Sequence, residues 1–564
     1  MTRPADFPPP FDPREFVAAP SDPPEGRIDV GVLIVGAGPA GLACAIRLGQ
    51  LLEESPEMAE RLGEVPVAVL EKGKGVGSHL VSGAVVNPRG LRRLFRGRDV
   101  QLDELPSFGR VEHESVYVLS SSTALRIPTP PTMRNDGNFV ASLSQLSRWL
   151  ADHAEAGGAA ILPETAAEKL LVEGARTVGV RTGDKGRGRD GDPLANFEPG
   201  SDVTAKVTVL AEGTQGHLTG IAIDRFGLAG ENPQVWALGV KEVWKVAKPL
   251  DRVIHTMGWP LRGGRRYREF GGSFIYPMGE DMVTIGMVVG LDYRDAELSV
   301  HDLLQELKTH RFVRKILAGG ERVGWGAKTI PEGGFVALPR RLHAPGLLLT
   351  GDGAGLVNVP ALKGIHYAIE SGRLAADAAF EALKPGRTPW TPGALASYDE
   401  SLRNTYLWDD LKKVRNMRQA FANGFVLGGA MAGAMTASFG KFPPGDKKTE
   451  QDGEQELFLT LRGRRYPAPD GKLTFDKLSS VYLSGNKTRD DAPNHLRVRT
   501  DVPPLLGRLW ERMCPAQVYE VSENGGETTV EITPSNCVQC GAITAKGGRL
   551  TPPEGGSGPE YTLT

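Results

Sequence analysis

Two things are scarce in this chain of 564 residues: cysteine, and an excess of charge of either sign. The four cysteines are too few to form a disulfide scaffold in a chain of this length. Lys and Arg number 66 against 68 Asp and Glu, so the net charge of -2 provides no general attraction to nucleic acid. The composition therefore excludes a small disulfide-stabilised class and predicts no nucleic-acid partner.

The first 28 residues lack a targeting signal. They contain neither an apolar core stretch nor an Arg-rich helix, and they have proline at positions 4, 8, 9, 10, 13, 20, 23 and 24. Such a composition predicts an extended arm that wraps the surface or stays disordered. We expect the protein to work where it is made, on the cytoplasmic side of a bacterial cell.

A long, strongly apolar run is also missing, although residues 419–440 carry no charge. Five glycines and six alanines among these 22 residues would bury little apolar area, so a span across the roughly 30 Å hydrocarbon layer is poorly supported. Basic residues flank the segment: Lys412, Lys413, Arg415 and Arg418 before it, and Lys441, Lys447 and Lys448 after it. We expect the segment to dip into one leaflet or to shield an entry to the interior, with its basic flanks on anionic lipid. An internal helix packed by small residues is the alternative.

A dinucleotide-binding fingerprint is present near the N-terminus. Residues 32–35 form a continuous apolar run typical of a buried parallel strand, and a helical pattern starts at Pro39. Between them, Gly36 permits a tight turn, Gly38 lets the backbone approach a pyrophosphate, and Gly41 allows close helix packing. The segment therefore predicts a nucleotide diphosphate at the start of a helix.

Two acidic residues extend this pattern. Residues 67–70 predict the next strand, which ends at Glu71, placed to accept hydrogen bonds from a ribose. Residues 346–355 carry Gly351 and Asp352 at the end of another buried strand, where an aspartate would bond a ribityl hydroxyl of a flavin. The three features in this order resemble the FAD-binding glutathione-reductase-like family, so FAD is favoured over NAD.

Three of the four cysteines lie near the C-terminal end: Cys514, Cys537 and Cys540. Thiolates at this spacing suit an iron–sulfur cluster or zinc. Together with a flavin they indicate an electron relay on one polypeptide. The fourth cysteine, Cys44, follows the fingerprint and is interpreted as a small packed residue.

Further strings resemble one family, the electron transfer flavoprotein:ubiquinone oxidoreductases, over nearly the whole chain. They are Gly77-Ser78-His79-Leu80-Val81-Ser82-Gly83-Ala84, Gly137-Asn138-Phe139, Ala211-Glu212-Gly213, Gly258-Trp259-Pro260-Leu261, Gly271-Gly272-Ser273-Phe274, Thr329-Ile330-Pro331-Glu332-Gly333-Gly334, Val357-Asn358-Val359-Pro360, Lys363-Gly364, Leu478-Ser479-Ser480-Val481 and Pro552-Pro553-Glu554-Gly555-Gly556. No single string is decisive. Their number and order make coincidence improbable.

The resemblance implies an α/β plus α+β architecture: a glutathione-reductase-like FAD domain, an interleaved quinone-binding domain and a C-terminal ferredoxin-like domain. After the arm at 1–28, we expect FAD-binding parts at 29–240 and 336–385, with interleaved segments near 100–135. The remaining parts are expected to be a quinone-binding domain at 241–335, a helical membrane-facing segment at 386–460 and the cysteine-containing domain at 461–564.

The resemblance also implies the reaction. Reduced electron transfer flavoprotein passes electrons singly to a membrane-associated flavoprotein, which reduces ubiquinone or another quinone to the quinol. Expected FAD contacts are Gly36, Gly38, Gly41, Glu71, Ser82, Gly213, Gly351 and Asp352, and expected quinone contacts are the backbones of Gly271 and Gly272. Glycine at the last two positions suits a flat ring that approaches bare backbone, or else a bulge. A monomer bound to the cytoplasmic face of the bacterial inner membrane is implied, and no residue is assigned a catalytic role.

The cysteine tail departs from the family pattern. Relatives hold a [4Fe–4S] cluster with four thiolates, whereas Ile543 stands at the fourth position here. Because isoleucine cannot ligate iron, a three-iron cluster, a four-iron cluster completed by an oxygen ligand, and no cluster all stay open. Tyr519, five residues after Cys514 as in relatives, would donate a hydrogen bond to a cluster sulfur.

Two rival interpretations share the flavin motifs. One is a monooxygenase or a geranylgeranyl-reductase-like FAD enzyme, but aromatic hydroxylases carry an Asp-Gly segment ending in Arg where residues 211–217 lie, and that Arg is missing here. A flavin-binding adaptor that has lost turnover is suggested by the missing ligand at Ile543. Quinol production by the purified protein separates the enzyme from the adaptor.

Overall fold

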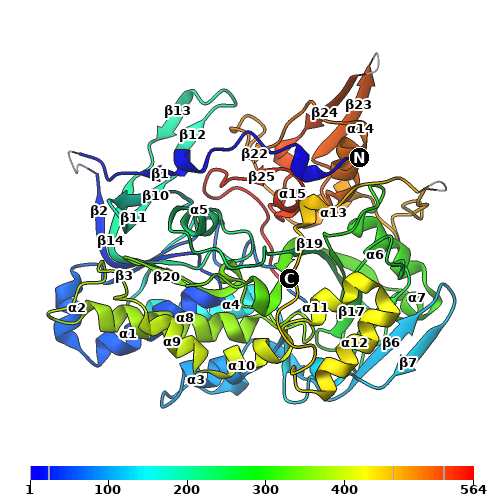
Figure 1. The fold of residues 1–564 in the computed structure, drawn as a ribbon, viewed down its shortest axis with the longest axis horizontal. Coiled ribbons are helices and arrows are strands. Elements are labelled where there is room, and N and C mark those ends of the chain that lie inside the picture. Colours follow the sequence, from blue (N-terminus) through cyan, green and yellow to red (C-terminus); the bar gives the residue numbers. More distant parts are fainter. Residues whose placement is uncertain (1, 23–25, 461–462, 525–526) are drawn as a thin grey trace.

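The computed structural model describes residues 2–22, 26–460, 463–524 and 527–564. Residues 23–25 of the predicted arm and position 461, the expected start of the last domain, lie outside the described residues. Two large sheets lie side by side, with helices below the first sheet and the C-terminal segment above the second (Figure 1).

The first sheet has nine strands and carries the fingerprint. Its parallel centre is β14 (Asp202–Leu210), β2 (Ile28–Val35), β3 (Val67–Leu70) and β9 (Ala160–Leu162), with β21 (Leu347–Leu349) on the other side of β14. The apolar runs at 30–35, 67–70 and 347–349 form strands because their side chains are buried on both faces, whereas the short outer strand β9 is partly exposed. The predicted strand, glycine turn and helix are confirmed, since β2 leads directly into α1 (Pro39–Glu53).

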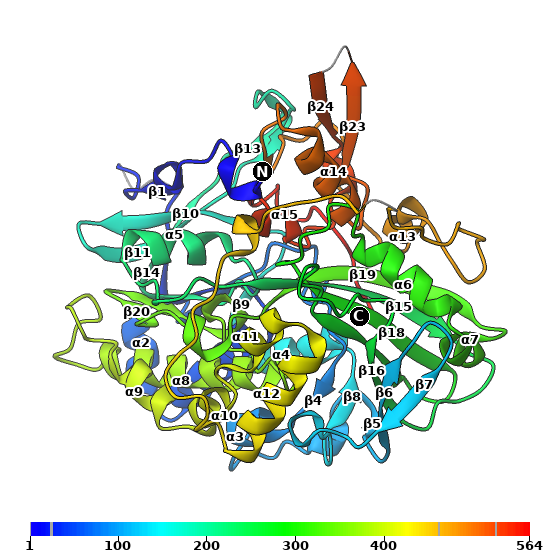
Figure 2. The same ribbon diagram turned by 45° about the vertical axis from the view of Figure 1, so that its right-hand side comes forward.

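Helices cover one face of this sheet. α1 packs against α8 (Ile365–Leu383) and α4 (Leu143–Ala156), and α8 and α4 lie below the strands of this sheet in Figure 2. The carboxyl ends of β2, β3 and β21 meet at the same edge of the sheet, where the predicted nucleotide contacts follow them. The fold therefore gathers the fingerprint and both acidic residues around one site.

The second sheet has seven strands from distant parts of the chain. In spatial order they are β19 (Glu321–Pro331), β15 (Trp236–Lys245), β18 (Met282–Gly290), β17 (Gly271–Pro277), β16 (Val253–Gly258), β6 (Glu114–Leu119) and β7 (Ala124–Ile127). The hairpin of β6 and β7 joins the sheet through a parallel pairing of β6 with β16. The second sheet thus includes β15 from Trp236 onward. It also includes residues of the 100–135 region, in β6 and β7.

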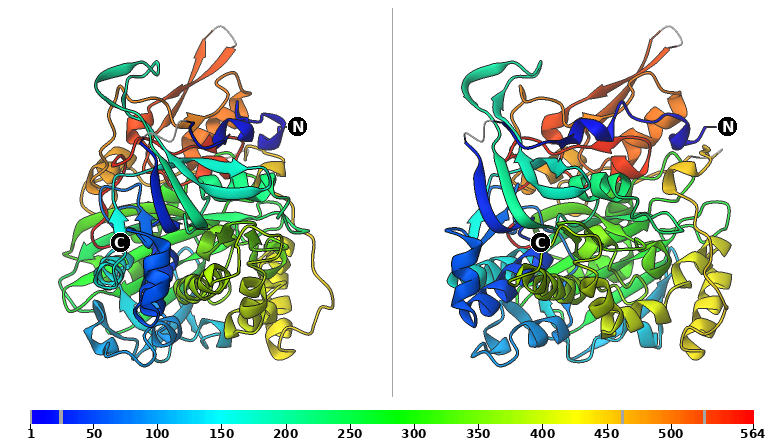
Figure 3. Two further views of the ribbon diagram at one scale, coloured as in Figure 1. Left: turned by 90° about the vertical axis from the view of Figure 1, so that its left-hand side faces the viewer. Right: turned by 60° about the vertical axis from the view of Figure 1, so that its left-hand side comes forward.

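The C-terminal segment shares its hydrophobic core with the second sheet. Trp510 on α14 (Pro504–Met513) and Leu238 on β15 belong to the same cluster of buried residues, as do Cys514 and Ile543. The chain then returns to the middle of the molecule, where the C-terminus is marked in Figures 1 and 3. There the carbonyl of Thr564 accepts a hydrogen bond from Ser144 N on α4 at 3.2 Å.

The predicted arm and the uncharged segment both lie on the outside. The described part of the arm forms short 3-10 turns and β1 (Val17–Ala18), which pairs with β10 (Ala167–Glu173), so the arm wraps the surface (Figure 3). The uncharged segment contains α12 (Phe425–Ala437) at the edge of the second sheet (Figure 2). Among the described residues, no helix is long and apolar enough to cross a membrane.

Candidate functional site

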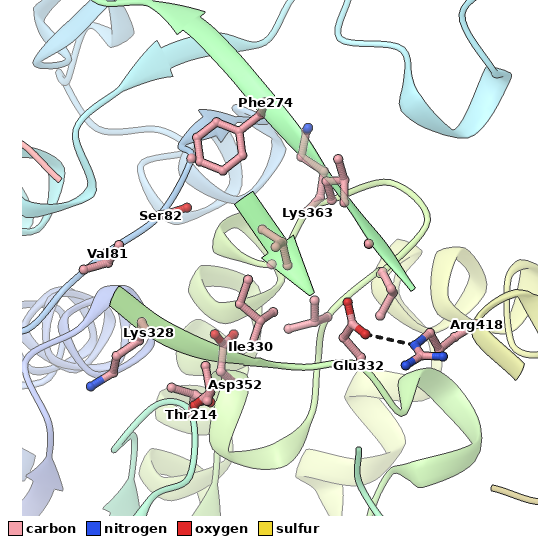
Figure 4. A pocket seen from close by; sticks show the side chains of 18 of the residues that line it. Val81, Ser82, Thr214, Phe274, Lys328, Ile330, Glu332, Asp352, Lys363 and Arg418 are labelled. Carbon is pink, nitrogen blue, oxygen red and sulfur yellow. Dashed lines mark hydrogen bonds and ion pairs between the residues drawn. The ribbon is translucent and has the colours of Figure 1, made fainter. Parts of the chain in front are cut away.

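One cavity of about 1180 Å³ runs from the glycine turn after β2 to α12. It is lined by the fingerprint, by the loop of residues 79–85, by β17 and β19, and by α12. Figure 4 shows part of this lining, with Asp352 and Thr214 on one side and Glu332 with Arg418 on the other. A single space therefore connects the nucleotide turn with the uncharged helix.

The three fingerprint glycines differ in what surrounds them. A Cβ on Gly36, which has φ +105°, would lie 2.5 Å from Ala211 O, and a Cβ on Gly41 would collide with Gly36 O. A Cβ on Gly38 would find its nearest neighbour, Leu80 Cδ2, at 4.0 Å. Gly36 and Gly41 are thus required by packing, whereas Gly38 leaves open room at the cavity wall, as a pyrophosphate needs.

Glu71 lies at the end of β3 and orders the glycine turn. Its two carboxylate oxygens accept hydrogen bonds from Ala37 N at 3.1 Å and from Gly73 N at 2.7 Å. The side chain also lines the cavity, so it fixes the turn that would hold a diphosphate and still faces a ligand.

Asp352 enters the cavity from the opposite strand end. It lies in a 3-10 turn after β21, next to Gly351, whose N–H donates to Ser371 Oγ at 3.0 Å. Burial raises the pKa of Asp352 to about 6, and among the described residues no group donates a hydrogen bond to its carboxylate. A ribityl hydroxyl would supply the missing donor.

Two further predicted flavin contacts also line the cavity. Gly213 has φ +73° and open space around its missing side chain, while Glu212 beside it caps the helix at 217–225 through Leu218 N and Thr219 N. Ser82 Oγ accepts a hydrogen bond from Ala84 N at 3.1 Å. All the predicted flavin residues except Gly41, which packs behind the turn, therefore border one space.

Packing between strands is enough to explain why glycine occupies positions 271 and 272. Both begin β17 and line the cavity, but a Cβ on Gly272 would lie 2.5 Å from Thr256 O. A Cβ on Gly271 would collide with Val288 O of β18. Close strand packing therefore demands glycine at both positions before any ligand is considered.

The far end of the cavity is aromatic and lies against α12. Phe421 and Phe425 line it together with Met417, and the ring of Phe421 lies 4.9 Å from that of Phe270. Besides Phe425, α12 contributes small or apolar residues to the lining: Val426, Gly429, Ala432, Gly433, Thr436 and Ala437. This lobe would accept a flat apolar ring with a hydrocarbon tail.

Arg418 corrects one expectation. The sequence placed it among the basic flanks that meet lipid, but it is only 6% exposed. Its guanidinium donates to Glu332 Oε2 at 2.9 Å and to Asp292 Oδ1 at 2.7 Å, and it lies over the ring of Phe270. Glu332 and Arg418 both line the cavity, and the sequence offered no signal for their pairing.

Lys241 is a second residue that the sequence did not single out. It is buried on β15, and its ammonium group donates to Ser82 O at 2.8 Å. Burial lowers its pKa to about 7. The contact ties the predicted flavin loop to the second sheet.

The three C-terminal cysteines lie close to one another, beside the C-terminal end of β19. Backbone N–H groups donate to two of their sulfurs: Val518 N to Cys514 Sγ at 3.4 Å and Gln539 N to Cys537 Sγ at 3.3 Å. Cys540 O accepts hydrogen bonds from the N–H and the hydroxyl of Thr329, both at 2.9 Å. The hydroxyl of Thr329 lies 3.1 Å from that of Thr214 at the cavity wall.

Two half-buried lysines lie beside the cysteine loop. Lys72 donates to Gln539 Oε1 at 2.7 Å, and Lys328 donates to Gln539 O at 3.0 Å. Burial lowers the pKa of both lysines, that of Lys328 to about 7, and it raises the pKa of Cys540 to about 12. Tyr519 is buried beside the same three thiols. Backbone donors and nearby amines fit an anionic iron–sulfur group.

The fourth position does not fit such a group. Ile543 on α15 (Ala542–Ala545) is buried, and a Cβ on Gly548 would lie 2.5 Å from its Cγ1, so its side chain packs on Gly548. Among residues 2–22, 26–460, 463–524 and 527–564, no three His, Cys, Asp or Glu side chains lie close enough to hold a single metal ion. The zinc alternative has no ligand set in this part of the chain, and the cysteines supply three of the four thiolates of a cubane.

Comparisons with known proteins agree with this geometry. Residues 236–330 match a family model described as "ETF-QO, ubiquinone-binding", and residues 471–562 match one described as "Electron transfer flavoprotein-ubiquinone oxidoreductase, 4Fe-4S". Among solved structures, a geranylgeranyl bacteriochlorophyll reductase-like protein from Thermoplasma acidophilum is similar in fold, with a TM-score of 0.54 and 16% identity over 78% of this chain and 95% of that chain.

Curated relatives are similar over nearly the whole chain. The mitochondrial electron transfer flavoprotein-ubiquinone oxidoreductase of Oryza sativa subsp. japonica is 38% identical, over 94% of this chain and 92% of its own length. The electron transfer flavoprotein-ubiquinone oxidoreductase of Pseudomonas aeruginosa is 37% identical, over 95% of this chain and 98% of its own length. The chain therefore belongs to the electron transfer flavoprotein-ubiquinone oxidoreductase family.

Proposed function

We propose that this protein is an FAD enzyme that takes electrons from reduced electron transfer flavoprotein and reduces ubiquinone or a related quinone to the quinol. The observation that carries the proposal is the single cavity that joins the fingerprint, β17 and α12. Near the C-terminal end of β19, Thr329 contacts Cys540 O, and Glu332, three residues later, lines the aromatic lobe. The names of the relatives supply the donor and the acceptor.

FAD would lie between the glycine turn and Asp352, where Gly36, Gly38, Gly41, Glu71, Ser82, Gly213, Gly351 and Asp352 hold or shape its place. When bound, FAD supplies chemistry that exchanges electrons one or two at a time. Glu71 orders the turn that would hold the diphosphate, and Asp352 would accept a hydrogen bond from the ribityl chain. The helix α8, which follows this turn, directs its N-terminus toward the same space.

The quinone would enter the aromatic lobe beside α12. Gly271 and Gly272 offer bare backbone at the cavity wall, and Phe421 and Phe425 offer apolar surface. Cys514, Cys537 and Cys540 would hold an iron–sulfur group, as three irons or as four irons with a non-protein ligand. The remaining cysteine of the sequence, Cys44, lies in α1 within the core of the first sheet, so it does not complete a four-thiolate set.

We propose that α12 attaches the protein to a membrane surface without crossing it. Val426 is 84% exposed and Leu427 is 56% exposed, next to exposed Phe439 and Phe442. Exposed lysines flank this patch: Lys412, Lys413, Lys441, Lys447 and Lys448. An apolar patch with basic flanks suits the headgroup boundary of a bilayer with anionic lipid. The protein would be a monomer on the cytoplasmic face of the bacterial inner membrane.

The proposed domains follow the two sheets. The arm covers 1–28. The FAD-binding parts cover 29–240 and 336–385, apart from the hairpin of β6 and β7 and the start of β15, and the quinone-binding part covers 241–335 together with those two segments. The membrane-facing segment covers 386–460, and the cysteine-containing part covers 461–564.

Anaerobic turnover tests the function. Detergent-solubilised protein should contain one FAD and should reduce a short-chain ubiquinone only when reduced electron transfer flavoprotein is supplied. Quinol formation is followed by the absorbance of the quinone. Protein that holds FAD but forms no quinol with any quinone would instead be an adaptor.

A further inference from the structure

The strand β19 arranges three side chains along the cavity. Lys328, Ile330 and Glu332 follow one another at every second position, so they share one side of the extended chain, and all three line the cavity (Figure 4). Lys328 lies beside the cysteine loop through its contact with Gln539 O. Glu332 ends the series in the aromatic lobe and is the acidic residue nearest to Arg418 there.

In the part of the chain that the structure describes, the Glu332 carboxylate has one hydrogen-bond partner. Its Oε2 accepts from Arg418 Nε at 2.9 Å, and its other oxygen points away from the guanidinium in Figure 4. Its backbone is fixed as well, since Glu332 N donates to Val235 O at 2.7 Å. A carboxyl oxygen is thus held rigidly at the wall of the lobe that we assign to the quinone.

Arg418 is shared between two buried carboxylates. It also donates to Asp292 Oδ1 at 2.7 Å, so two acids compete for one guanidinium. Burial raises the pKa of Glu332 despite the ion pair, whereas Arg418, with help from Arg268 and Lys546, holds the pKa of Asp292 below its usual value. Two neighbouring carboxyls whose environments push their pKa values apart are typical of an acid and its ionised support.

We propose that Glu332 is the proton donor to the quinone and that Asp292 acts on it as a positioning residue through Arg418. This proposal rests on the proposed function, because it needs the quinone in the aromatic lobe. Formation of a quinol takes two electrons and two protons. The electrons come from the reduced donor. One proton leaves the Glu332 carboxyl as its O–H bond breaks and forms an O–H bond on a quinone oxygen; the second proton and the one that restores Glu332 come from solvent.

Two acceptors separate proton delivery from electron delivery. A short-chain ubiquinone needs protons, whereas ferricenium takes one electron and no proton. We expect Glu332→Gln to lower the ratio of the ubiquinone rate to the ferricenium rate by about 100-fold, the usual range for loss of a general acid. Glu332→Asp, which keeps a carboxyl group, should recover part of that ratio. Glu370→Gln is the matched control, because Glu370 is a buried partner of Arg373 outside the cavity, and its ratio should equal that of the parent protein.

The pH profile provides the second measurement. The charged groups that face Glu332 and its partner are Arg418, Asp292, Arg268, Asp452 and Lys546. As an acid, Glu332 works while protonated, so the ubiquinone rate should fall as the pH rises through its pKa. Asp292→Asn leaves Arg418 to Glu332 alone, which lowers that pKa and moves the fall to lower pH, while Glu332→Gln should remove it.

The outcomes are distinct. A parent protein that reduces no quinone overturns the proposed function itself. A parent protein that reduces ubiquinone, together with a Glu332→Gln ratio within twofold of it, overturns only the role of Glu332. An Asp292→Asn profile that stays in place or moves to higher pH overturns the positioning role of Asp292.

Discussion

Gly38 is the fingerprint residue at which a new side chain would meet ligand and not protein. Because the nearest atom to an added Cβ is 4.0 Å away, the fold has room for one. We expect Gly38→Val to abolish FAD binding, since the side chain fills the place of the pyrophosphate, while the apoprotein stays folded. Absorbance after desalting measures FAD, and circular dichroism measures the fold.

Gly41→Val is the matched comparison for this change. Its Cβ would collide with Gly36 O, so we expect both FAD and folded protein to be lost. Full FAD occupancy in Gly38→Val would remove the fingerprint from the site.

Ile543 decides the number of irons that the cysteine tail can hold. With three thiolates, the iron that faces Ile543 has no protein ligand, so we expect oxidised protein to show a [3Fe–4S] signal or no iron. Ile543→Cys should raise the iron content to four per chain and give a stable four-iron EPR signal on reduction. Elemental analysis of anaerobically purified protein measures the content.

Thr544→Cys is the control for the tail. The Thr544 hydroxyl accepts a hydrogen bond from Leu550 N at 3.1 Å. A thiol at this position would take the same place beside Leu550 N, so we expect it to add no iron. Four irons per chain in the parent protein, unchanged by ferricyanide, would show that another ligand completes the site.

Asp352 makes the flavin-free protein sensitive to pH. Its folded pKa of about 6 lies above the ordinary value of 3.8, so the folded chain keeps a proton that the unfolded chain releases. The contribution to stability is fully present below about pH 4 and is lost as the pH rises toward about 6. Between about pH 4 and pH 6, the thermal midpoint of the parent apoprotein should fall as the pH rises. The midpoint of apo Asp352→Asn should fall less over the same range. Parallel midpoint curves for the two proteins would contradict this assignment.

At the scale of elements, α12 is the most exposed apolar helix beside the cavity. If it rests on lipid, charges on its outer side should release the protein, so we expect Val426→Asp with Leu427→Asp to move it from the membrane fraction to the soluble fraction with FAD still bound. Flotation with anionic lipid vesicles measures binding. Leu478→Asp with Tyr482→Asp removes an equal number of exposed apolar side chains on α13 (Lys477–Leu483) and should leave binding intact. Parent protein that stays soluble in the presence of vesicles would make α12 part of another interface.

The same elements show what the sequence could and could not predict. The buried parallel strands, the glycine turn and the acidic strand ends follow from local patterns, so the flavin part of the site was predictable. The pairing of Arg418 with Glu332 was not, because the two residues are 86 positions apart and a charge has no local signature of its burial. The basic residues beside the uncharged segment were predicted to meet lipid. Lys412 and Lys413 are exposed, as that contact requires, whereas Arg418 is buried.

At the scale of the whole molecule, distant segments complete each sheet and each site. β6 joins the second sheet from the middle of the FAD-binding region, and its pairing with β16 spans more than a hundred residues of chain. Such parallel pairings are set by tertiary packing and leave no periodic trace in either segment. Family strings could therefore place the domains in order along the chain but not the path of the chain between them.

Tyr561 connects three parts of the molecule: the C-terminal segment, the flavin loop and β19. Its N–H donates to Ser78 O at 3.0 Å beside the flavin loop, its hydroxyl accepts from Ala327 N of β19 at 3.3 Å, and its side chain is 2% exposed.

We expect Tyr561→Ala to cost about 3–5 kcal/mol of stability, as for other buried aromatic residues, and to weaken FAD retention although it lies far from the fingerprint in sequence. Tyr482→Ala, at a side chain 84% exposed, should change stability by less than about 0.5 kcal/mol. Denaturant unfolding and FAD release on dilution measure both effects. Because one residue ties the C-terminal segment to both the flavin loop and β19, stability and FAD retention should fall together, and a loss of stability with unchanged FAD retention would separate the C-terminal segment from the flavin site.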